Sequence, residues 1–283
     1  MSVRLIALDI DGTLLNSSQE VPDANRAAIS EATSRGVEIA LVTGRRYDFA
    51  MLVADQLNLP LTMIASNGAV VRSPDGQTHL RQLLPSTTAK KVLEGTRQWR
   101  DGAAVIFDRP GSNQIMLENF DPDDSVRYWY YTRNKEYIGI ADSLESCMTE
   151  EPLQVLFSGK VARMREAETA LRGLSFAGEY AIAATVYESK DFTMIDVVHP
   201  EVSKEAALAK WARQRGIARD EIMAIGDNHN DLGMLSFAGT PVVMGNCVRE
   251  LKTFGWHETG TNDEAGVASA IRHFVLGKAG SCV

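Results

Sequence analysis

The sequence predicts an α/β fold in which a Rossmann-like, doubly wound parallel sheet is interrupted by an inserted α+β domain. Continuous apolar runs alternate with helical stretches near both ends of the chain, a pattern typical of strands buried on both faces of a sheet. That alternation stops near residue 70 and resumes after His199-Pro200. Acidic and hydroxyl residues follow the apolar runs, at the strand ends where open α/β sheets bind ligands.

The N-terminal part of the core reads strand, helix, strand, helix, strand. The predicted strands span 5–8, 37–42 and 61–65, and the predicted helices span 22–35 and 47–57. Pro22 is tolerated in the first turn of a helix, and Gly36 stands where a C-terminal glycine cap belongs. This order implies parallel strands connected by right-handed helical crossovers.

The middle of the chain does not show this alternation of strand and helix. After a small predicted hairpin (70–84), helices are expected at 87–100 and 161–171 and strands at 103–107, 153–157, 181–187 and 192–198. The core pattern then returns with helices at 203–215, 231–238 and 265–276 and strands at 222–225 and 241–244. We therefore predict a core formed by residues 1–83 and 199–283 and an inserted α+β cap domain at 84–198.

Composition excludes several classes of protein. Of 283 residues, 29 are Lys or Arg and 37 are Asp or Glu, so the net charge of −8 argues against nucleic acid or an anionic membrane as partner. The three cysteines, Cys147, Cys247 and Cys282, are far apart and form no metal-binding pair or disulfide framework. No apolar stretch approaches the roughly 18 residues of a membrane span. We expect a cytoplasmic protein; the sequence indicates no oligomeric state.

Two carboxylates follow the first predicted strand. Asp9 and Asp11 flank Ile10, and residues two apart in a strand point to the same side. Such carboxylates repel each other unless a cation or a proton lies between them. On position alone, a solvated turn with both acids capping a helix explains them equally well.

A second acidic cluster, residues 226–231, follows a later strand. Capping explains Asp231 well but explains Asp227 poorly, because Asp227 stands at the strand end itself. Carboxylate oxygens that converge from two strand ends suit Mg²⁺. His229 is expected to be a loop residue, because the sequence has no partner His or Cys at ligand spacing.

Hydroxyl, amide and cationic groups occupy three further strand ends or helix starts. Thr43-Gly44-Arg45 offers a hydroxyl, backbone amides and a guanidinium to phosphate oxygens, although a capping Thr beside a solvated Arg is the better explanation in isolation. Asn67 lies in a similar turn after the third strand. Lys204 follows Ser203, a candidate cap, so its cation lies at the unfavourable positive end of a helix dipole. A nearby anion would offset that cost, although an exposed lysine that tolerates the position is the better explanation in isolation.

Taken together, these stretches resemble the haloacid dehalogenase (HAD) superfamily of phosphotransferases. Its four motifs are matched by residues 9–13 (DxDGT), Thr43, Lys204 and residues 226–231 (GDxxND). Residues 66–69, 244–246 and 261–267 look like those of the subclass IIB, Cof-like sugar phosphatases. Two departures are Glu205, where the family often has Gly, and Cys247, which replaces a common small residue.

The resemblance implies a magnesium-dependent phosphatase that hydrolyses a small phosphorylated metabolite through an aspartyl-phosphate, with a sugar phosphate as the expected substrate. It makes Asp9 the nucleophile and Asp11 the acid that protonates the leaving alcohol and then activates water. Mg²⁺ would be held by a carboxylate oxygen of Asp9, the backbone carbonyl of Asp11 and the carboxylate of Asp227. Asp231 would orient Lys204 or a metal-bound water.

The resemblance also implies a set of residues that bind the phosphate or the rest of the substrate: Thr43, Gly44, Arg45, Asn67, Lys204 and Asn230. The cap is expected to close over the site, with Glu188 and Asp191 as conceivable specificity contacts, although solvated loop positions explain these two acids better. The aromatic run 128–131 fits the interior or surface of the cap better than a substrate wall.

Two other functions remain open at this point. A phosphomutase of the same superfamily would return the phosphoryl group to the substrate and not to water. A receiver-type regulatory module also holds an aspartyl-phosphate with strand-end acids, a Thr and a Lys. The second reading needs only about 120 residues and leaves the insert and Asp11 without a role. A dinucleotide-binding protein is disfavoured, because no GxGxxG follows the first strand.

Overall fold

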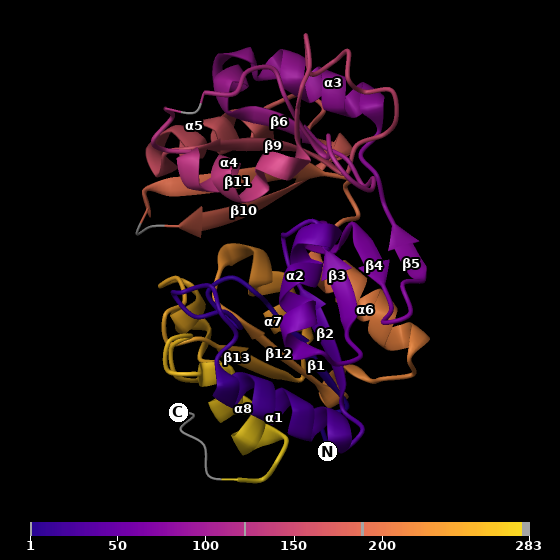
Figure 1. Cartoon of the computed structure of the whole chain (residues 1–283), viewed down its shortest axis with the longest axis vertical. Coiled ribbons are helices and arrows are strands. Elements are labelled where there is room, and N and C mark those ends of the chain that lie inside the picture. The colour runs from indigo at the N-terminus through magenta and orange to yellow at the C-terminus, as the bar shows by residue number, and fades with distance from the viewer. Residues whose placement is uncertain (1, 122, 188–189, 279–283) are drawn as a thin grey trace. The chain divides into compact units, whose positions relative to one another are not determined.

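The computed structural model describes residues 2–121, 123–187 and 190–278 (Figure 1). The chain divides into two compact units, one formed by residues 1–81 and 203–283 and the other by residues 82–202. These divisions lie beside the expected boundaries at 83/84 and 198/199. Within the described residues, no helix has both the length and the apolar character needed to cross a membrane.

The core unit is built on an eight-stranded sheet with the order β14-β13-β12-β1-β2-β3-β4-β5. Its strands are β1 (Leu5–Leu8), β2 (Glu38–Val42), β3 (Thr62–Ala65), β4 (Val70–Arg72), β5 (Thr78–Arg81), β12 (Ile222–Gly226), β13 (Thr240–Val243) and β14 (His257–Glu258). Its helices are α1 (Asp23–Ser34), α2 (Tyr47–Leu57), α6 (Lys204–Gln214), α7 (Leu232–Phe237) and α8 (Gly266–Phe274).

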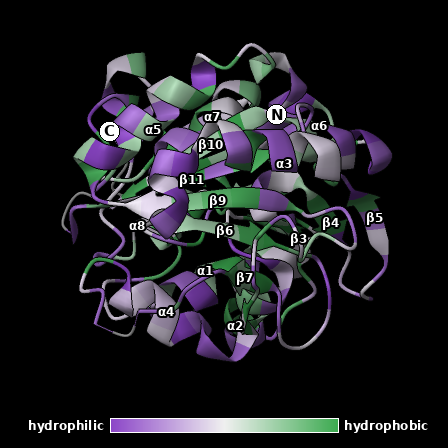
Figure 2. Ribbon diagram, turned by 90° about the horizontal axis from the view of Figure 1, so that it is seen from above, coloured by the Kyte–Doolittle hydropathy of each residue, from purple (hydrophilic) through white to green (hydrophobic). Residues whose placement is uncertain are grey.

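Helices cover both faces of this sheet, as the alternating sequence pattern predicts. Ile6 and Leu8 of β1 pack in a buried cluster with residues of α1, α2 and α8. Leu5 and Ala7 of the same strand face the opposite way and pack with residues of α6 and α7. Because successive side chains of a strand alternate between faces, β1 is apolar throughout its length. Figure 2 shows the strands mainly in green, with purple frequent on the surrounding helices and loops.

The sheet is parallel over most of its strands, and the hairpin expected at 70–84 joins its edge in antiparallel pairing. The pairs from β14 to β3 are parallel, whereas β4 pairs antiparallel with both β3 and β5. The physical reason is connection length, because a short turn can only return the chain antiparallel and a parallel partner needs a long crossover. The short edge strand β14 was not predicted; at two residues it has no readable periodicity.

The inserted unit is an α+β domain with a six-stranded sheet of order β10-β11-β9-β6-β7-β8. Its strands are β6 (Ala103–Ile106), β7 (Ile115–Leu117), β8 (Ile138–Ile140), β9 (Gln154–Gly159), β10 (Ala181–Tyr187) and β11 (Phe192–Val198). Its helices are α3 (Ser86–Gly95), α4 (Tyr128–Asn134) and α5 (Val161–Arg172). One continuous apolar cluster joins α3 and α5 to the sheet.

One expectation for this unit is wrong in detail, and three of its short elements were not expected. The helix expected at 87–100 ends at Gly95, and a separate 3-10 segment (Arg97–Gly102) follows it. Gly95 favours helix termination because glycine has low helix propensity. The short elements β7, β8 and α4 were not predicted, since segments of three to seven residues carry too little periodicity to recognise.

Candidate active site

The site begins at the ends of two neighbouring parallel strands of the core unit. Leu8 of β1 lies opposite Ile225 of β12, so Asp9 and Asp227 leave the sheet side by side. The amide of Asp9 donates to the Ile225 carbonyl at 3.0 Å and continues the ladder by one residue. Residues more than two hundred positions apart therefore meet at the carboxyl edge of the sheet, where ligands of α/β proteins bind.

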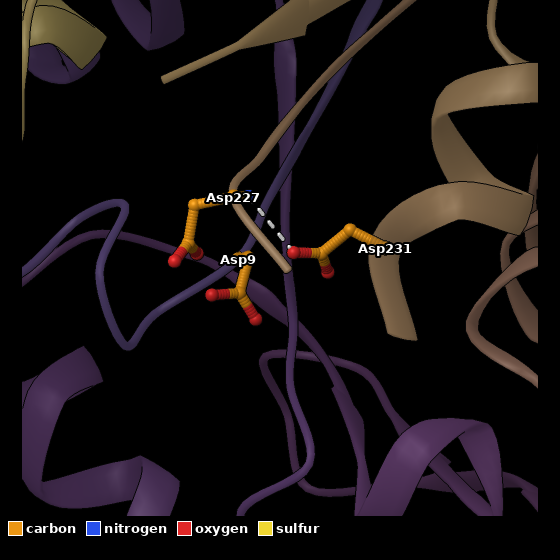
Figure 3. A group of neighbouring side chains, drawn as sticks. All are labelled: Asp9, Asp227 and Asp231. Atoms are coloured by element: carbon orange, nitrogen blue, oxygen red, sulfur yellow. Dashed lines mark hydrogen bonds between the residues drawn. The ribbon is translucent and has the colours of Figure 1, made fainter. Parts of the chain in front are cut away.

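Asp231 completes an acidic group with these two residues. Carboxylate oxygens of Asp9, Asp227 and Asp231 lie within 4.8 Å of one another, and all three residues are buried. Figure 3 shows Asp9 and Asp227 on strand-end loops and Asp231 at the turn that begins the next helix. Gathering three carboxylates out of water is unfavourable unless positive charge compensates them.

Lys204 supplies part of that charge. Its ammonium donates to Asp9 Oδ1 and to Asp231 Oδ1, each at 2.5 Å, and its side chain is 1% exposed. The Ser203 hydroxyl caps α6 by accepting from the Ala206 amide, which places Lys204 in the first helical turn. The two carboxylates offset the unfavourable position of a cation at the positive end of the helix dipole.

The pKa shifts indicate that the acidic group lacks positive charge. Burial, with repulsion from Asp231, raises the pKa of Asp9 to about 7 even though Lys204 lowers it. Burial, Asp9 and Asp231 likewise raise the pKa of Asp227 well above its ordinary value. Burial alone would lower the pKa of Lys204, but Asp231 and Asp9 outweigh it and hold that pKa above the usual range. One ammonium is too little charge for three carboxylates.

Two glycines allow the acids to approach so closely. A Cβ on Gly12, which has φ +81°, would lie 2.3 Å from Asp227 Oδ2. A Cβ on Gly226 would lie 2.7 Å from the Cβ of Asp231. Any larger residue at either position would displace a carboxylate, and only glycine adopts positive φ without strain.

Both oxygens of Asp231 are occupied, whereas Asp227 is held on one side. Asp231 Oδ2 accepts from the backbone amides of Asp227 and Asn228, each at 3.0 Å, and its Oδ1 accepts from Lys204. The Thr13 hydroxyl donates to Asp227 Oδ1 at 2.9 Å. Asp231 therefore acts on its neighbours as an orienting group, while Asp9 and Asp227 are the carboxylates with capacity for a cation.

Asp11 has a partner that sequence reasoning missed. The Arg45 guanidinium donates to Asp11 Oδ2 from Nε and to Asp11 Oδ1 from Nη2, each at 2.6 Å. Arg45 also lies over the Phe49 ring, 4.8 Å from its centroid. A bidentate, partly buried pair of this kind is among the stronger ionic contacts in proteins. The two residues lie 34 positions apart, so no local pattern in the sequence links them.

Four of the predicted phosphate-binding residues follow three strands of the core sheet, β2, β3 and β12. Thr43 is buried after β2, and its hydroxyl accepts from the Arg45 amide at 3.0 Å. Its carbonyl accepts from the Asn67 amide at 2.9 Å. Asn230 Nδ2 donates to Asn67 Oδ1 at 3.1 Å, and a Cβ on Gly44 would lie 3.2 Å from that same oxygen. Thr43, Gly44, Asn67 and Asn230 are thus neighbours.

The remaining expectations concern the inserted unit. Asp191 accepts from the Val161 amide at 3.2 Å, at the start of α5, and Glu188 lies outside the described residues. Trp129 of the aromatic run packs edge-on against Tyr187 and Phe192, with ring centroids 5.4 and 5.1 Å away. These contacts give Asp191 and Trp129 roles in packing within their own unit.

Comparison with known proteins adds independent information. A family model described as haloacid dehalogenase-like hydrolase matches residues 6–271. The putative phosphatase YxeH of Bacillus subtilis is 31% identical over 97% of this chain and 99% of its own. The 5-amino-6-(5-phospho-D-ribitylamino)uracil phosphatase YcsE of the same bacterium is 32% identical over 98% of this chain and 97% of its own. The crystal structure of a haloacid dehalogenase-like hydrolase from Bacteroides thetaiotaomicron superimposes with a TM-score of 0.79 at 26% identity, covering 96% of this chain and 99% of that one.

Proposed function

This chain belongs to the haloacid dehalogenase-like hydrolase family and is a phosphatase, and we propose that it hydrolyses a small phosphorylated metabolite through a phosphorylated Asp9 in the presence of Mg²⁺. The observation that carries the proposal is the buried Asp9 carboxylate, which Lys204 fixes at one oxygen beside Asp227. Because the chain is a phosphatase, the alternative of a regulatory module that only holds an aspartyl-phosphate is set aside.

The acidic group fits a hard divalent cation. Its three carboxylates are accompanied by one ammonium, and burial raises the pKa of both Asp9 and Asp227. We assign Asp9, Asp227 and the backbone carbonyl of Asp11 to Mg²⁺, because both oxygens of Asp231 are already bound. When bound, the ion supplies charge that reduces the repulsion between the substrate phosphate and Asp9.

Asp9 and Asp11 divide the chemistry between them. Lys204 holds Asp9 Oδ1, so we assign Oδ2 to the attack on phosphorus. The new Asp9 oxygen–phosphorus bond forms as the bond between phosphorus and the leaving oxygen breaks, and Asp11, once protonated and released from Arg45, gives its proton to that oxygen. In the second step a water attacks phosphorus, Asp11 takes its proton, and Asp9 is released with inorganic phosphate.

The neighbouring polar groups position the phosphate. We assign its non-bridging oxygens to the Thr43 hydroxyl, the Gly44 amide, the Lys204 ammonium and the Asn230 amide, with Asn67 holding Asn230 by the bond at 3.1 Å. Phosphoryl transfer relies mainly on positioning and charge, so this ring of donors supplies most of what the protein contributes. Arg45 reaches the substrate only if it exchanges part of its contact with Asp11.

A phosphate-release screen tests the proposal. The panel contains hexose and pentose monophosphates, polyol phosphates and the ribitylaminouracil phosphate named for YcsE. Each ester is assayed in magnesium and in a chelator. We expect at least one ester to release phosphate at a rate that depends on magnesium, with sugar phosphates favoured. A product that keeps its phosphate at a new position would instead identify a phosphomutase.

Removal of Asp227 provides a more local prediction. Asp227→Ala is expected to raise the magnesium concentration for half-maximal activity by about 100-fold, since loss of even a supporting group costs metal sites about 10–100-fold. Magnesium titration of activity and calorimetry with Mg²⁺ alone measure this. Asp55→Ala, which removes an exposed acid from α2, is the matched control. An unchanged titration in Asp227→Ala would remove this residue from the ligand set.

A further inference from the structure

The loop that follows β1 carries Asp11, Gly12 and Thr13, and side chains from two distant loops hold its backbone. Asn246, in the loop after β13, donates from Nδ2 to the Gly12 carbonyl at 2.8 Å. Asn262, in the loop after β14, donates from Nδ2 to the Leu15 carbonyl at 2.8 Å. Neither asparagine has a role in the chemistry described above.

The two asparagines also bind each other, which closes a ring of hydrogen bonds. The backbone amide of Asn262 donates to Asn246 Oδ1 at 2.9 Å. Asn246 therefore uses both ends of its side-chain amide although the residue is exposed. An exposed amide gains little from each bond alone, so engagement of both ends indicates a fixed arrangement and not incidental contact.

The ring acts on backbone that touches the acidic group. Gly12 is the glycine whose Cβ would meet Asp227 Oδ2 at 2.3 Å, and the adjacent Thr13 donates to Asp227 Oδ1. The loop that carries Asn246 also contacts Asp227 directly, because the Val248 amide donates to the Asp227 carbonyl at 2.9 Å. A shift of Gly12 would therefore move Asp227 and the Asp11 carbonyl together.

We propose that Asn246 and Asn262 are positioning residues that fix the loop from Asp11 to Leu15 against the acidic group, so that its backbone and Asp227 are preorganised for the cation. Only the predicted effects on kcat and KM rest on the function proposed above. The placement of the loop and the affinity for Mg²⁺ alone are properties of the folded protein, whatever its substrate.

Asn246→Ala tests the proposal because it opens the ring at two bonds. We expect hydrogen exchange of the amides of residues 11–17 to accelerate, the dissociation constant for Mg²⁺ alone to rise about 10-fold by calorimetry, and kcat to fall by a similar factor with KM little changed. Asn262→Ala keeps the backbone bond to Asn246 and should give a smaller effect in the same direction. Because the residues share one ring, the effects should be non-additive in the double variant.

Ser17→Ala is the matched control. Ser17 lies farther along the same loop, and its hydroxyl donates to Asp263 at 2.6 Å, so the substitution removes one bond without opening the ring. Its magnesium affinity and kcat should stay within about 2-fold of wild type. Asn246→Ala with wild-type magnesium affinity and wild-type exchange would overturn the proposal, and so would a lower melting temperature as its sole effect. If the wild type releases no phosphate from any ester, the proposed function fails while calorimetry and exchange still decide this inference.

Discussion

Asp9→Asn is expected to abolish phosphate release, with a loss of at least about 10³-fold in kcat, while the fold stays intact. The amide matches the carboxylate in size but cannot form the phosphorylated intermediate. The Lys204 ammonium keeps its second partner, Asp231, so the buried cation is not left unpaired. Phosphate release from the best ester of the panel measures the loss of kcat, and circular dichroism shows whether the fold is intact. Activity above a few per cent of wild type would reject Asp9 as the nucleophile.

The same variant changes how stability depends on pH in the absence of metal. The folded protein holds the pKa of Asp9 at about 7, above the ordinary value of 3.8, so between these values the folded state binds more protons than the unfolded state. Wild type should therefore lose stability as pH rises from about 4 to 7, a contribution that Asp9→Asn lacks. Urea unfolding in chelator at several pH values measures the difference. If the free energy of unfolding changed with pH in the same way in both proteins, the raised pKa of Asp9 would not be the cause.

Lys204→Met is expected to impair both activity and stability. It removes the only ion-pair partner described for Asp9 and leaves three buried carboxylates together. Loss of one partner from a buried ionic group costs about 3–5 kcal/mol in the free energy of unfolding. Loss of a donor to the transferring phosphate should lower kcat by about 10²-fold or more. Urea unfolding with and without Mg²⁺, and steady-state kinetics, measure these effects.

A variant on the same helix separates this effect from general damage. Lys210→Met removes an exposed lysine of α6 and should leave kcat and the free energy of unfolding near wild type. Magnesium should stabilise Lys204→Met more than it stabilises wild type, because the ion replaces part of the lost positive charge. If Lys204→Met kept wild-type kcat, the lysine would have a structural role alone.

The sequence could predict the core fold because its signals are local and repeated. Apolar runs such as Leu5–Leu8 followed by polar strand ends indicate buried parallel strands, and the family comparison confirms the resemblance drawn from the motifs. The meeting of Asp9 and Asp227 also follows from local pattern, since both come directly after buried strands. Neighbouring parallel strands end at one edge of the sheet, so spacing along the chain does not matter.

Contacts that depend on side-chain direction could not be predicted. The pairing of Asp11 with Arg45 requires that a carboxylate after β1 and a guanidinium after β2 turn toward each other, and no periodicity records that. The residue pattern alone predicts the capping role of Asp231, and only the family resemblance predicts its contact with Lys204, because that contact depends on how α6 packs. The hairpin of β4 and β5 is predicted from the sequence, whereas its antiparallel pairing with β3 is not.

The most direct test of the account is identification of the phosphorylated residue. The enzyme is mixed with the fastest ester of the panel, quenched in acid within one turnover, digested and mapped by mass spectrometry. We predict one phosphoryl group on the peptide that contains Asp9, absent from Asp9→Asn and retained in Asp227→Ala at saturating magnesium. Turnover without any phosphorylated peptide, or a phosphoryl group on the peptide that contains Asp227 and Asp231, would contradict it.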